Sequence, residues 1–293
     1  APARPRTSAS VFTRRNARLA AARLPRTASA PHSGRGAPPR FMQPDEYLKL
    51  SAIEDRLWYF RSLHAQIARE LDRHPLPPDA RVLDAGCGTG GLILRLRQTH
   101  PARRWSGLDF SHLACDLARQ RCGPSAEIVE ASATAIPFAD ATFDAVVSAD
   151  LLCQFDDPAP AVREFFRVLR PGGLAVINAP AYQWLWSYHD AATHGKRRFN
   201  RPQLRALLHD AGFTVARLTH TNAFLLPLAI VKRKLLPAPP PSSAGSDVRD
   251  FPALLDTAFA TCAALERAWL RTGLNLPFGT SVLAVARKPS SVP

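Results

Sequence analysis

Residues 81–91 read Arg-Val-Leu-Asp-Ala-Gly-Cys-Gly-Thr-Gly-Gly, a short apolar run that leads into a glycine-rich turn. The apolar run predicts a buried strand, and the residues after the turn predict a helix. Glycine permits positive backbone φ angles and lets a ligand approach the main chain. The first turn of a helix also presents free N–H groups. The stretch therefore predicts a ligand-binding loop, with a tight turn that holds no ligand as the alternative.

Strand-like and helix-like patterns alternate after this loop. Buried strands are expected at 81–85, 104–108, 126–131, 143–149 and 173–178, with helices at 90–99, 111–121 and 159–170. The segment Pro171-Gly172-Gly173 is expected to end one helix and turn into the next strand. Such alternation predicts a parallel sheet with helices on both faces. Further elements are expected on the flanks: helices at 44–73, 201–211 and 249–270, and strands at 213–221 and 280–288.

The carboxylate before the glycines discriminates between two cofactor classes. Gly86, Gly88 and Gly91 fit the dinucleotide pattern G-x-G-x-x-G. Asp84 followed by Gly86, Gly88 and Gly90 fits D-x-G-x-G-x-G, which is typical of S-adenosylmethionine sites. An acid at the strand end would repel a pyrophosphate, but it suits the cationic amino group of a methionine moiety. The pattern therefore favours S-adenosylmethionine over a dinucleotide.

A second acid ends the next predicted strand. Asp109 lies 19 residues after Gly90, where a carboxylate can accept hydrogen bonds from both hydroxyls of a ribose. Phe110 beside it can pack on a base. The alternative role for Asp109 is a helix N-cap, although Ser111 can supply that cap itself.

At this point the chain resembles the class I S-adenosylmethionine-dependent methyltransferases of the ubiquinone/menaquinone-methyltransferase-like group. The resemblance covers roughly 80–180 and rests on four segments: LDAGCGTG, GLDFS, ASATAIPFADATFDAVVSADLL and EFFRVLRPGG. It implies a methyltransferase (EC 2.1.1.-) with S-adenosylmethionine as cofactor. It also implies an α/β fold: a doubly wound, seven-stranded, mostly parallel, Rossmann-like sheet whose last two strands form an antiparallel edge.

The resemblance also implies a domain plan. We expect a disordered basic tail (1–41), a helical N-terminal segment (42–79), a cofactor-binding core (80–180) and an acceptor-side region (181–293). The last region would contain a helical insertion (222–279) before the final strand (280–288). The N-terminal segment and the insertion are expected to cap the carboxyl ends of the strands, where ligands bind in such sheets.

Individual residues are carried over from the same resemblance. It assigns the methionine end of the cofactor to Asp84 and the glycines, the ribose to Asp109, the adenine edge to Ser132 and Ala133, and the sulfonium side to Asp150 and Leu151. Two positions depart from the family pattern. Ser132 stands where the family usually has Asp, so we expect somewhat weaker cofactor binding, since a hydroxyl accepts without charge assistance. Gln154 stands where the family often has His, which puts a direct role there in doubt.

Both flanks of the core resemble a bacterial subgroup of these enzymes, in the segments 45–60, 179–204 and 275–288. His194 and His189 are the candidate general bases, with Tyr182 and Tyr188 as weaker ones, and each could equally be structural. Arg197 and Arg198 could clamp a carboxylate or phosphate of the acceptor, or be solvated charges. Trp184, together with Trp186 and the insertion, suggests a small apolar or lipid-like acceptor.

The insertion begins with AFLLPLAIVKRKLL, which is too short to span a bilayer. Residues 222–236 could lie at a membrane interface, with Lys232, Arg233 and Lys234 toward anionic headgroups. The alternative is a helix folded over the sheet edge. No stretch of the chain is long and apolar enough to predict a transmembrane helix.

The net charge of +14 belongs mainly to one end of the 293-residue chain. Residues 1–41 contain nine arginines and no acid, so the remaining residues carry only +5. The tail is expected to be an upstream stretch absent from the natural protein, since the single methionine, Met42, follows it. An organelle transit peptide and a genuine basic arm are the alternatives. We therefore expect no nucleic-acid partner.

Five scattered cysteines, an odd number without a C-x-x-C pair, predict neither a disulfide framework nor a zinc site. They fit a reducing compartment, so we expect the cytoplasm, or an organelle if the tail is a transit peptide. No metal site is expected. Three other functions stay open: an RNA methyltransferase, a catalytically silent protein that binds S-adenosylmethionine, and a dinucleotide-dependent oxidoreductase.

Overall fold

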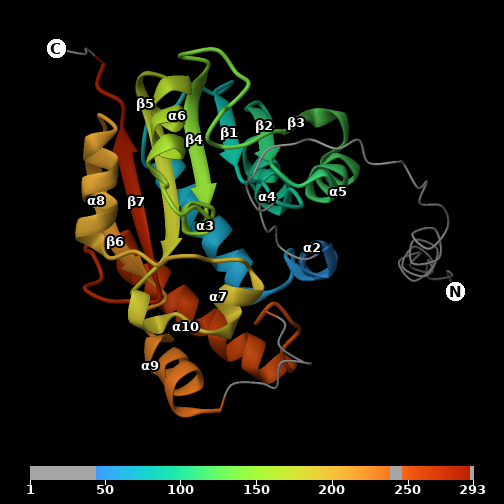
Figure 1. Ribbon diagram of the computed structural model, residues 1–293, viewed down its shortest axis with the longest axis vertical. Coiled ribbons are helices and arrows are strands. Elements are labelled where there is room, and N and C mark those ends of the chain that lie inside the picture. Colours follow the sequence, from blue (N-terminus) through green and yellow to red (C-terminus); the bar gives the residue numbers. More distant parts are fainter. Residues whose placement is uncertain (1–43, 238–245, 291–293) are drawn as a thin grey trace, which may run out of the picture. The chain divides into compact units, whose positions relative to one another are not determined.

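A seven-stranded sheet organises the part of the chain that the computed structural model describes, residues 44–237 and 246–290 (Figure 1). The predicted basic tail lies outside the described residues, as does most of the Pro- and Ser-rich linker at 237–247. The strands are β1 (Arg81–Ala85), β2 (Arg104–Asp109), β3 (Ala126–Glu130), β4 (Phe143–Ala149), β5 (Leu169–Pro180), β6 (Thr214–Thr221) and β7 (Ser281–Arg287). Their spatial order is β3-β2-β1-β4-β5-β7-β6, which confirms the predicted doubly wound sheet.

The last strand in sequence does not lie at the edge of the sheet. β7 is inserted between β5 and β6 and pairs antiparallel with both, whereas β1 to β5 pair in parallel. The predicted antiparallel pairing of the last two strands is therefore confirmed, with β6 outermost. β5 begins at Leu169, earlier than predicted, because Pro171-Gly172-Gly173 lies within an irregular first part of the strand. Gly172 adopts a left-handed conformation there, so these residues bend the strand instead of preceding it.

Helices cover both faces of the sheet, as the alternating pattern predicts. α3 (Trp58–Asp72), α4 (Gly91–Thr99) and α5 (His112–Cys122) pack on one face. α6 (Ala159–Val168) and α8 (Arg201–Asp210) pack on the other. Successive residues of β1 show this division. Val82 belongs to the apolar core beneath α3, α4 and α5, and Leu83 belongs to the core beneath α6 and α8. Short 3-10 turns connect elements at Gly123–Ser125, Leu152–Gln154 and Gln183–Leu185.

The N-terminal helical segment is broken in two, where the sequence predicts one helix over 44–73. α2 (Pro44–Ile53) ends before a turn, and α3 begins at Trp58 after Leu57 takes an extended conformation. The apolar periodicity continues through the break, but Glu54 is buried there and its carboxylate accepts a hydrogen bond from the Thr89 hydroxyl at 2.6 Å. That contact holds the turn against the glycine loop. α2 and this turn lie against the loop, whereas α3 lies along the face of the sheet.

The insertion lies at the carboxyl ends of β4 and β5, as predicted (Figure 1). It contains α9 (Leu226–Ile230), the π-helical turn η4 (Val231–Leu235) and α10 (Ala253–Arg271), which packs against α3. The short helix α7 (Tyr188–Ala192), which the sequence does not predict, lies beside them. Among the described residues, no helix is long and apolar enough to cross a membrane.

Candidate functional site

The glycine loop links β1 to α4 at the carboxyl edge of the sheet. Gly86, Gly88 and Gly90 all have positive φ angles, between 51° and 84°. A Cβ atom at Gly86 would lie 2.9 Å from Cδ1 of Leu151, and one at Gly90 would lie 2.8 Å from Sγ of Cys122. Both distances are shorter than van der Waals contact, so a side chain at either position would displace the loop or its neighbour. Together with the positive φ angles, these contacts explain why glycine stands at both positions.

Asp84 is a buried carboxylate at the end of β1, with 2 % of its surface exposed. Neither of its oxygens has a hydrogen-bond partner among the described residues. Burial, and then the charge of Asp109, raise the pKa of Asp84 to about 7. A buried acid without a partner is costly in the isolated chain. A ligand cation beside Asp84 would supply the missing partner and favour its charged form.

Asp109 is fixed by backbone amides at the end of β2. One carboxylate oxygen accepts from the N–H of Gly88 at 3.0 Å, and the other accepts from the N–H of Ser111 at 3.0 Å. Burial raises the pKa of Asp109, whereas these hydrogen bonds favour the carboxylate and oppose the rise. Ser111 is the N-cap of α5, because its hydroxyl accepts from the N–H of Ala114. Asp109 is thus held directly against the glycine loop, while the capping role falls to Ser111 as expected.

The segment after β3 lies beside Asp109. The N–H of Ala131 donates to the carbonyl oxygen of Asp109 at 3.0 Å, which brings Ser132 and Ala133 to the same edge. The hydroxyl of Ser132 lies 2.8 Å from that of Thr134, and Ala133 is part of the apolar core. Phe110, which follows Asp109, is half exposed. The structure therefore brings together the residues predicted for the ribose and the base.

The loop after β4 carries a buried hydrogen-bond network. Asp150 accepts from the hydroxyl of Tyr59 at 2.6 Å and from the amide of Asn178 at 2.7 Å. Its backbone is left-handed, with a φ angle of 55°, which is unusual for a residue other than glycine and is often found at functional sites. Burial raises the pKa of Asp150, while the two hydrogen bonds oppose that shift. Leu151 follows and packs over Gly86, so both predicted residues border the glycine loop.

Two members of this network were missed by reasoning from the sequence alone. Tyr59 lies 91 residues before Asp150, on a helix whose apolar pattern explains an aromatic residue without any further role. Asn178 belongs to a strand that is otherwise apolar, and a buried amide in such a strand was a signal that could have found it.

The helix α2 covers the glycine loop. Tyr47 is hydrogen-bonded to the side chain of Ser111, and its burial next to Asp109 raises the pKa of the phenol. Glu54 forms an ion pair with Arg121, which also donates to both carboxylate oxygens of Asp55 at 2.8 Å. These contacts attach the N-terminal segment to α5 across the loop. These contacts could not be predicted from local patterns, since the partners are more than 60 residues apart.

Aromatic rings form a stack beyond β5. Tyr182 stacks between Trp184 and His220, with ring centroids 5.6 Å and 5.2 Å away. Trp184 is half exposed, and Trp186 is exposed on the same segment. This segment is therefore free to offer an apolar surface near the carboxyl ends of the strands.

The candidate bases lie on and after α7. Nδ1 of His189 accepts from the backbone N–H of Asp247 at 3.0 Å, and burial is the main cause that lowers the pKa of this histidine. His194 follows α7 with a left-handed φ angle of 55°. The next residue but one, Lys196, donates its backbone N–H to Cys153 at 2.8 Å, which places this segment beside the loop after β4.

The two candidate clamp residues differ in their surroundings. Arg198 is buried, forms a bidentate ion pair with Asp190 at 2.8 Å and 3.1 Å, and donates to the carbonyl oxygen of Ala181 at 3.0 Å. These contacts favour a structural role for Arg198. Arg197 is half-buried and donates to the carbonyl oxygen of Asp156.

Comparison with known proteins now bears on this geometry. Residues 83–177 match the family described as "Methyltransferase domain". A demethylmenaquinone methyltransferase of Thermus thermophilus is 39% identical over 100 residues, which are 33% of this chain and 46% of that protein. A 2-phytyl-1,4-naphthoquinone methyltransferase of Thermosynechococcus vestitus is 41% identical over 135 residues, which are 44% of this chain and 60% of that protein.

Residues 83–177 form a class I methyltransferase domain. The predicted family is thereby confirmed for this part of the chain. The chain spans about half the length of the curated relatives that it matches, and the matches centre on the cofactor-binding core.

Solved structures of low sequence identity share the fold of the methyltransferase domain. The methyltransferase in complex with the Haloferax volcanii Trm112 activator has a TM-score of 0.55 at 22% identity, covering 83% of this chain and 98% of its own. An S-adenosylmethionine-dependent methyltransferase of Thermotoga maritima has a TM-score of 0.52 at 20% identity, covering 83% and 95%.

The cofactor of this domain class is S-adenosylmethionine, as predicted. The residues of this chain fit it. The carboxylate of Asp84, which has no hydrogen-bond partner among the described residues, matches a cationic amino group, and the positive φ angles of Gly86, Gly88 and Gly90 shape the turn that leads into the free N–H groups of α4. The roles of the individual site residues stay predictions.

Proposed function

We propose that the chain transfers a methyl group from S-adenosylmethionine to a small, apolar or lipid-like acceptor. The observation that carries the proposal is Asp84, a buried carboxylate with no hydrogen-bond partner among the described residues, placed before a glycine loop with positive φ angles. The names of the curated relatives support the acceptor class, since they act on menaquinone precursors, a phytyl naphthoquinone and malonyl-[acyl-carrier protein]. The exposed aromatic side chains of Trp184 and Trp186 support the same class.

Methyl transfer requires alignment more than activation, because S-adenosylmethionine supplies a methyl group that already carries a good leaving group. Asp84 would hold the amino group and Asp109 the ribose hydroxyls. Ser132 and Ala133 would meet the adenine edge. Asp150 and Leu151 would line the sulfonium side, with Tyr59 and Asn178 keeping the Asp150 carboxylate in one orientation through their hydrogen bonds.

An acceptor that must lose a proton also needs a base. His194 and His189 are the candidate bases, and Nδ1 of His189 accepts from the N–H of Asp247. Arg197 is retained as a candidate contact for an anionic group of the acceptor. Arg198 would act instead by fixing Asp190, and through it the turn that carries His194.

Contact with a lipid phase through residues 222–236 is part of the proposal. Apolar side chains that are 41–72 % exposed support it: Phe224, Leu228, Val231, Leu235 and Leu236. The basic residues support contact with anionic headgroups less than expected, because Lys232 and Arg233 form ion pairs with Asp247 at 2.6 Å and 3.8 Å. The substitution Leu235→Asn should therefore reduce sedimentation with neutral phosphatidylcholine vesicles. Leu48→Asn, at an exposed position on α2, should not.

All five cysteines are free thiols, which supports a reducing compartment such as the cytoplasm.

Calorimetric titration of the full chain with S-adenosylmethionine, S-adenosylhomocysteine and NADH tests the cofactor. We expect the first two to bind and NADH not to bind, and we expect Asp84→Asn to lose the binding. Transfer of label from S-adenosyl-[methyl-3H]methionine to demethylmenaquinone, and to a total lipid extract, then tests the acceptor class. Cofactor binding without any labelled lipid would favour the catalytically silent alternative. Labelled RNA in place of labelled lipid would favour the RNA methyltransferase.

A further inference from the structure

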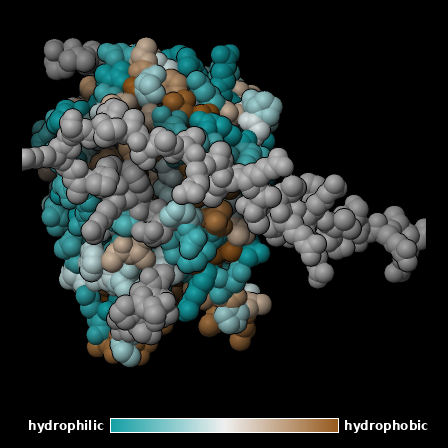
Figure 2. Space-filling model, turned by 45° about the vertical axis from the view of Figure 1, so that its right-hand side comes forward, coloured by the Kyte–Doolittle hydropathy of each residue, from teal (hydrophilic) through white to brown (hydrophobic). Residues whose placement is uncertain are grey.

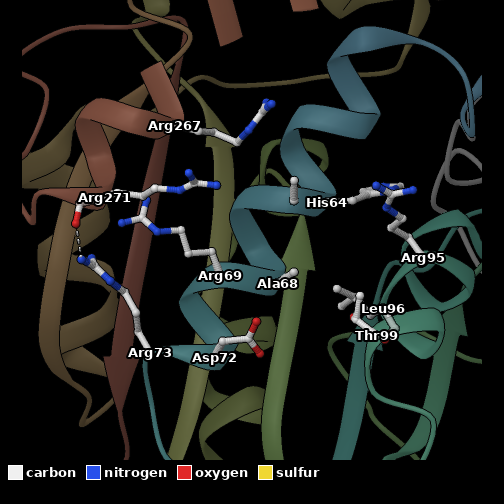
Figure 3. A pocket seen from close by; sticks show the side chains of 11 residues that line it. His64, Ala68, Arg69, Asp72, Arg73, Arg95, Leu96, Thr99, Arg267 and Arg271 are labelled. Carbon is white, nitrogen blue, oxygen red and sulfur yellow. Dashed lines mark hydrogen bonds between the residues drawn. The ribbon is translucent and has the colours of Figure 1, made fainter. Parts of the chain in front are cut away.

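A cleft lies on the outer side of the helical layer formed by α3, α4 and α10 (Figure 3). Its volume is about 450 Å³, within the range of small-molecule sites. Five of its eleven lining residues are arginines, which come from three helices: Arg69 and Arg73 from α3, Arg95 from α4, and Arg267 and Arg271 from α10. We call this feature the arginine cleft. Figure 3 shows Arg69 and Arg271 on the α10 side of α3, and Arg95 with His64 on the α4 side.

Nearby carboxylates are committed to other partners. Asp72, the one acid in the lining, lies 2.8 Å from Nε2 of His100 and 3.8 Å from Arg103. Glu70 pairs with Arg217 at 2.8 Å and accepts from the amide of Gln66. Among the described residues, none of the five arginines of the cleft forms an ion pair.

A third acid near the cleft is also committed. Glu266, which lies next to Arg267 in the sequence, accepts from the backbone N–H groups of Asn222 and Ala223 at 2.6 Å. None of the three carboxylates forms an ion pair with the five arginines, although the charges of Glu70 and Glu266 favour the charged forms of Arg69 and Arg267.

The hydrogen bonds that these arginines form with the described residues go to neutral acceptors. Arg73 donates to the carbonyl oxygen of Arg271 at 3.1 Å, and Arg267 donates to the hydroxyl of Ser62 at 2.8 Å. Arg69 donates to the carbonyl oxygen of Leu270, but its Nη1 atom is buried without a partner. Burial, followed by the repulsion of Arg73, lowers the pKa of the Arg69 guanidinium. The cleft therefore gathers five guanidinium groups that form no ion pair with the described residues.

We propose that the arginine cleft binds a ligand that carries phosphate groups, at a site separate from the methyltransferase site. Guanidinium groups match phosphate oxygens with paired, planar hydrogen bonds, which favours phosphate over a point anion. Arginines on three helices around 450 Å³ favour a ligand with at least two phosphate charges over a single small anion. The source of the phosphate is either a free phosphorylated compound or the headgroup of an anionic lipid.

The position of the cleft separates it from the methyl donor. The glycine loop meets α4 at Gly91, whereas the cleft is lined by Arg95 and by Thr99, the last residue of the helix. The helix rises by about 1.5 Å per residue, so Arg95 lies about 6 Å and Thr99 about 12 Å along α4 from the loop. The proposal thus stands independently of the proposed methyl transfer.

Calorimetric titration of the full chain with sodium pyrophosphate, sodium phosphate and sodium sulfate at near-physiological salt tests the proposal. We expect one pyrophosphate per chain, bound at least tenfold more tightly than phosphate or sulfate. Arg95→Gln and Arg271→Gln should each weaken pyrophosphate binding about tenfold, because both side chains are exposed and the fold does not depend on them. Arg205→Gln removes the same charge from an exposed position on α8 and should leave binding unchanged.

No binding of pyrophosphate by the folded chain would overturn the proposal. So would an equal loss in Arg205→Gln, which would show a diffuse charge effect. Tighter binding of a short single-stranded RNA than of pyrophosphate would overturn the assignment to a small phosphate ligand. Sedimentation with vesicles of phosphatidylcholine and phosphatidic acid, compared with phosphatidylcholine alone, distinguishes the sources. Loss of the extra binding in Arg95→Gln would identify a lipid headgroup, whereas no extra binding would identify a free phosphorylated compound.

Discussion

Asp84 should make the cofactor-free chain less stable as the pH rises. Its pKa is raised from 3.8 to about 7 in the folded chain. The stability that the protonated carboxyl contributes is therefore fully present below about pH 4, and it is lost as the pH rises through 7. Each pH unit between these values lowers the free energy of unfolding by about 1.4 kcal/mol. The whole range costs about 4 kcal/mol, of which roughly 2 kcal/mol develops above pH 5.5.

The substitution Asp84→Asn removes this titration and keeps the shape of the side chain. Its free energy of unfolding, relative to that of the unsubstituted chain, should rise by about 2 kcal/mol between pH 5.5 and pH 8. For a domain of this size, that corresponds to about 4–8 °C in the relative melting temperature. Thermal unfolding followed by circular dichroism at the two pH values measures the effect, without cofactor. Asp79→Asn, at an exposed acid, is the matched control.

The same substitution should abolish S-adenosylmethionine binding in calorimetry, because the amide cannot pair with a cation. A variant that is stabilised at high pH and does not bind would show that the acid is maintained for the ligand at the expense of stability. The reasoning would be refuted if the stability difference between Asp84→Asn and the unsubstituted chain were the same at pH 5.5 and pH 8.

Four further substitutions test other parts of the site. Asp109→Ala should weaken S-adenosylmethionine binding by about 1–3 kcal/mol through lost ribose bonds, and unchanged affinity in calorimetry would remove Asp109 from the site. Tyr59→Phe should lower turnover about tenfold, with little change in cofactor affinity, because one of the two bonds that orient Asp150 is lost; unchanged turnover would contradict this. His194→Ala should reduce turnover far more than cofactor affinity, and full turnover would make it structural. Arg198→Ala should destabilise the chain by about 3–5 kcal/mol in thermal unfolding, since Asp190 is left buried and unpaired; a loss below 1 kcal/mol would refute that role.

The parts of the fold that were predicted correctly depend on local chemistry. The strand 81–85 and the turn after it follow from an apolar run beside glycines, and their bounds agree with β1. The alternation of strands and helices follows from periodicity, which neighbouring residues define. Asp84 and Asp109 could be placed at the same edge because parallel strands end there.

The parts that were missed depend on contacts between distant residues. The break between α2 and α3 follows from the contact of Glu54 with Thr89, which the apolar pattern around Glu54 does not reveal. The network around Asp150 needs Tyr59, from a helix that pattern alone assigns to packing. The arginine cleft joins α3, α4 and α10, which no local signal connects.

The position of β7 also bears on how the chain is made. In the described sheet β6 pairs only with β7, and the far edge of β5 is likewise covered by β7. During synthesis, the edge of β5 therefore stays open while β6 and the whole insertion emerge from the ribosome. An open edge in a partly made sheet is a template for unwanted pairing between nascent chains. The final strand thus acts as a closing step, and a chain that ends before Ser281 would retain the cofactor loop but lack the strand that joins the two parts of its sheet.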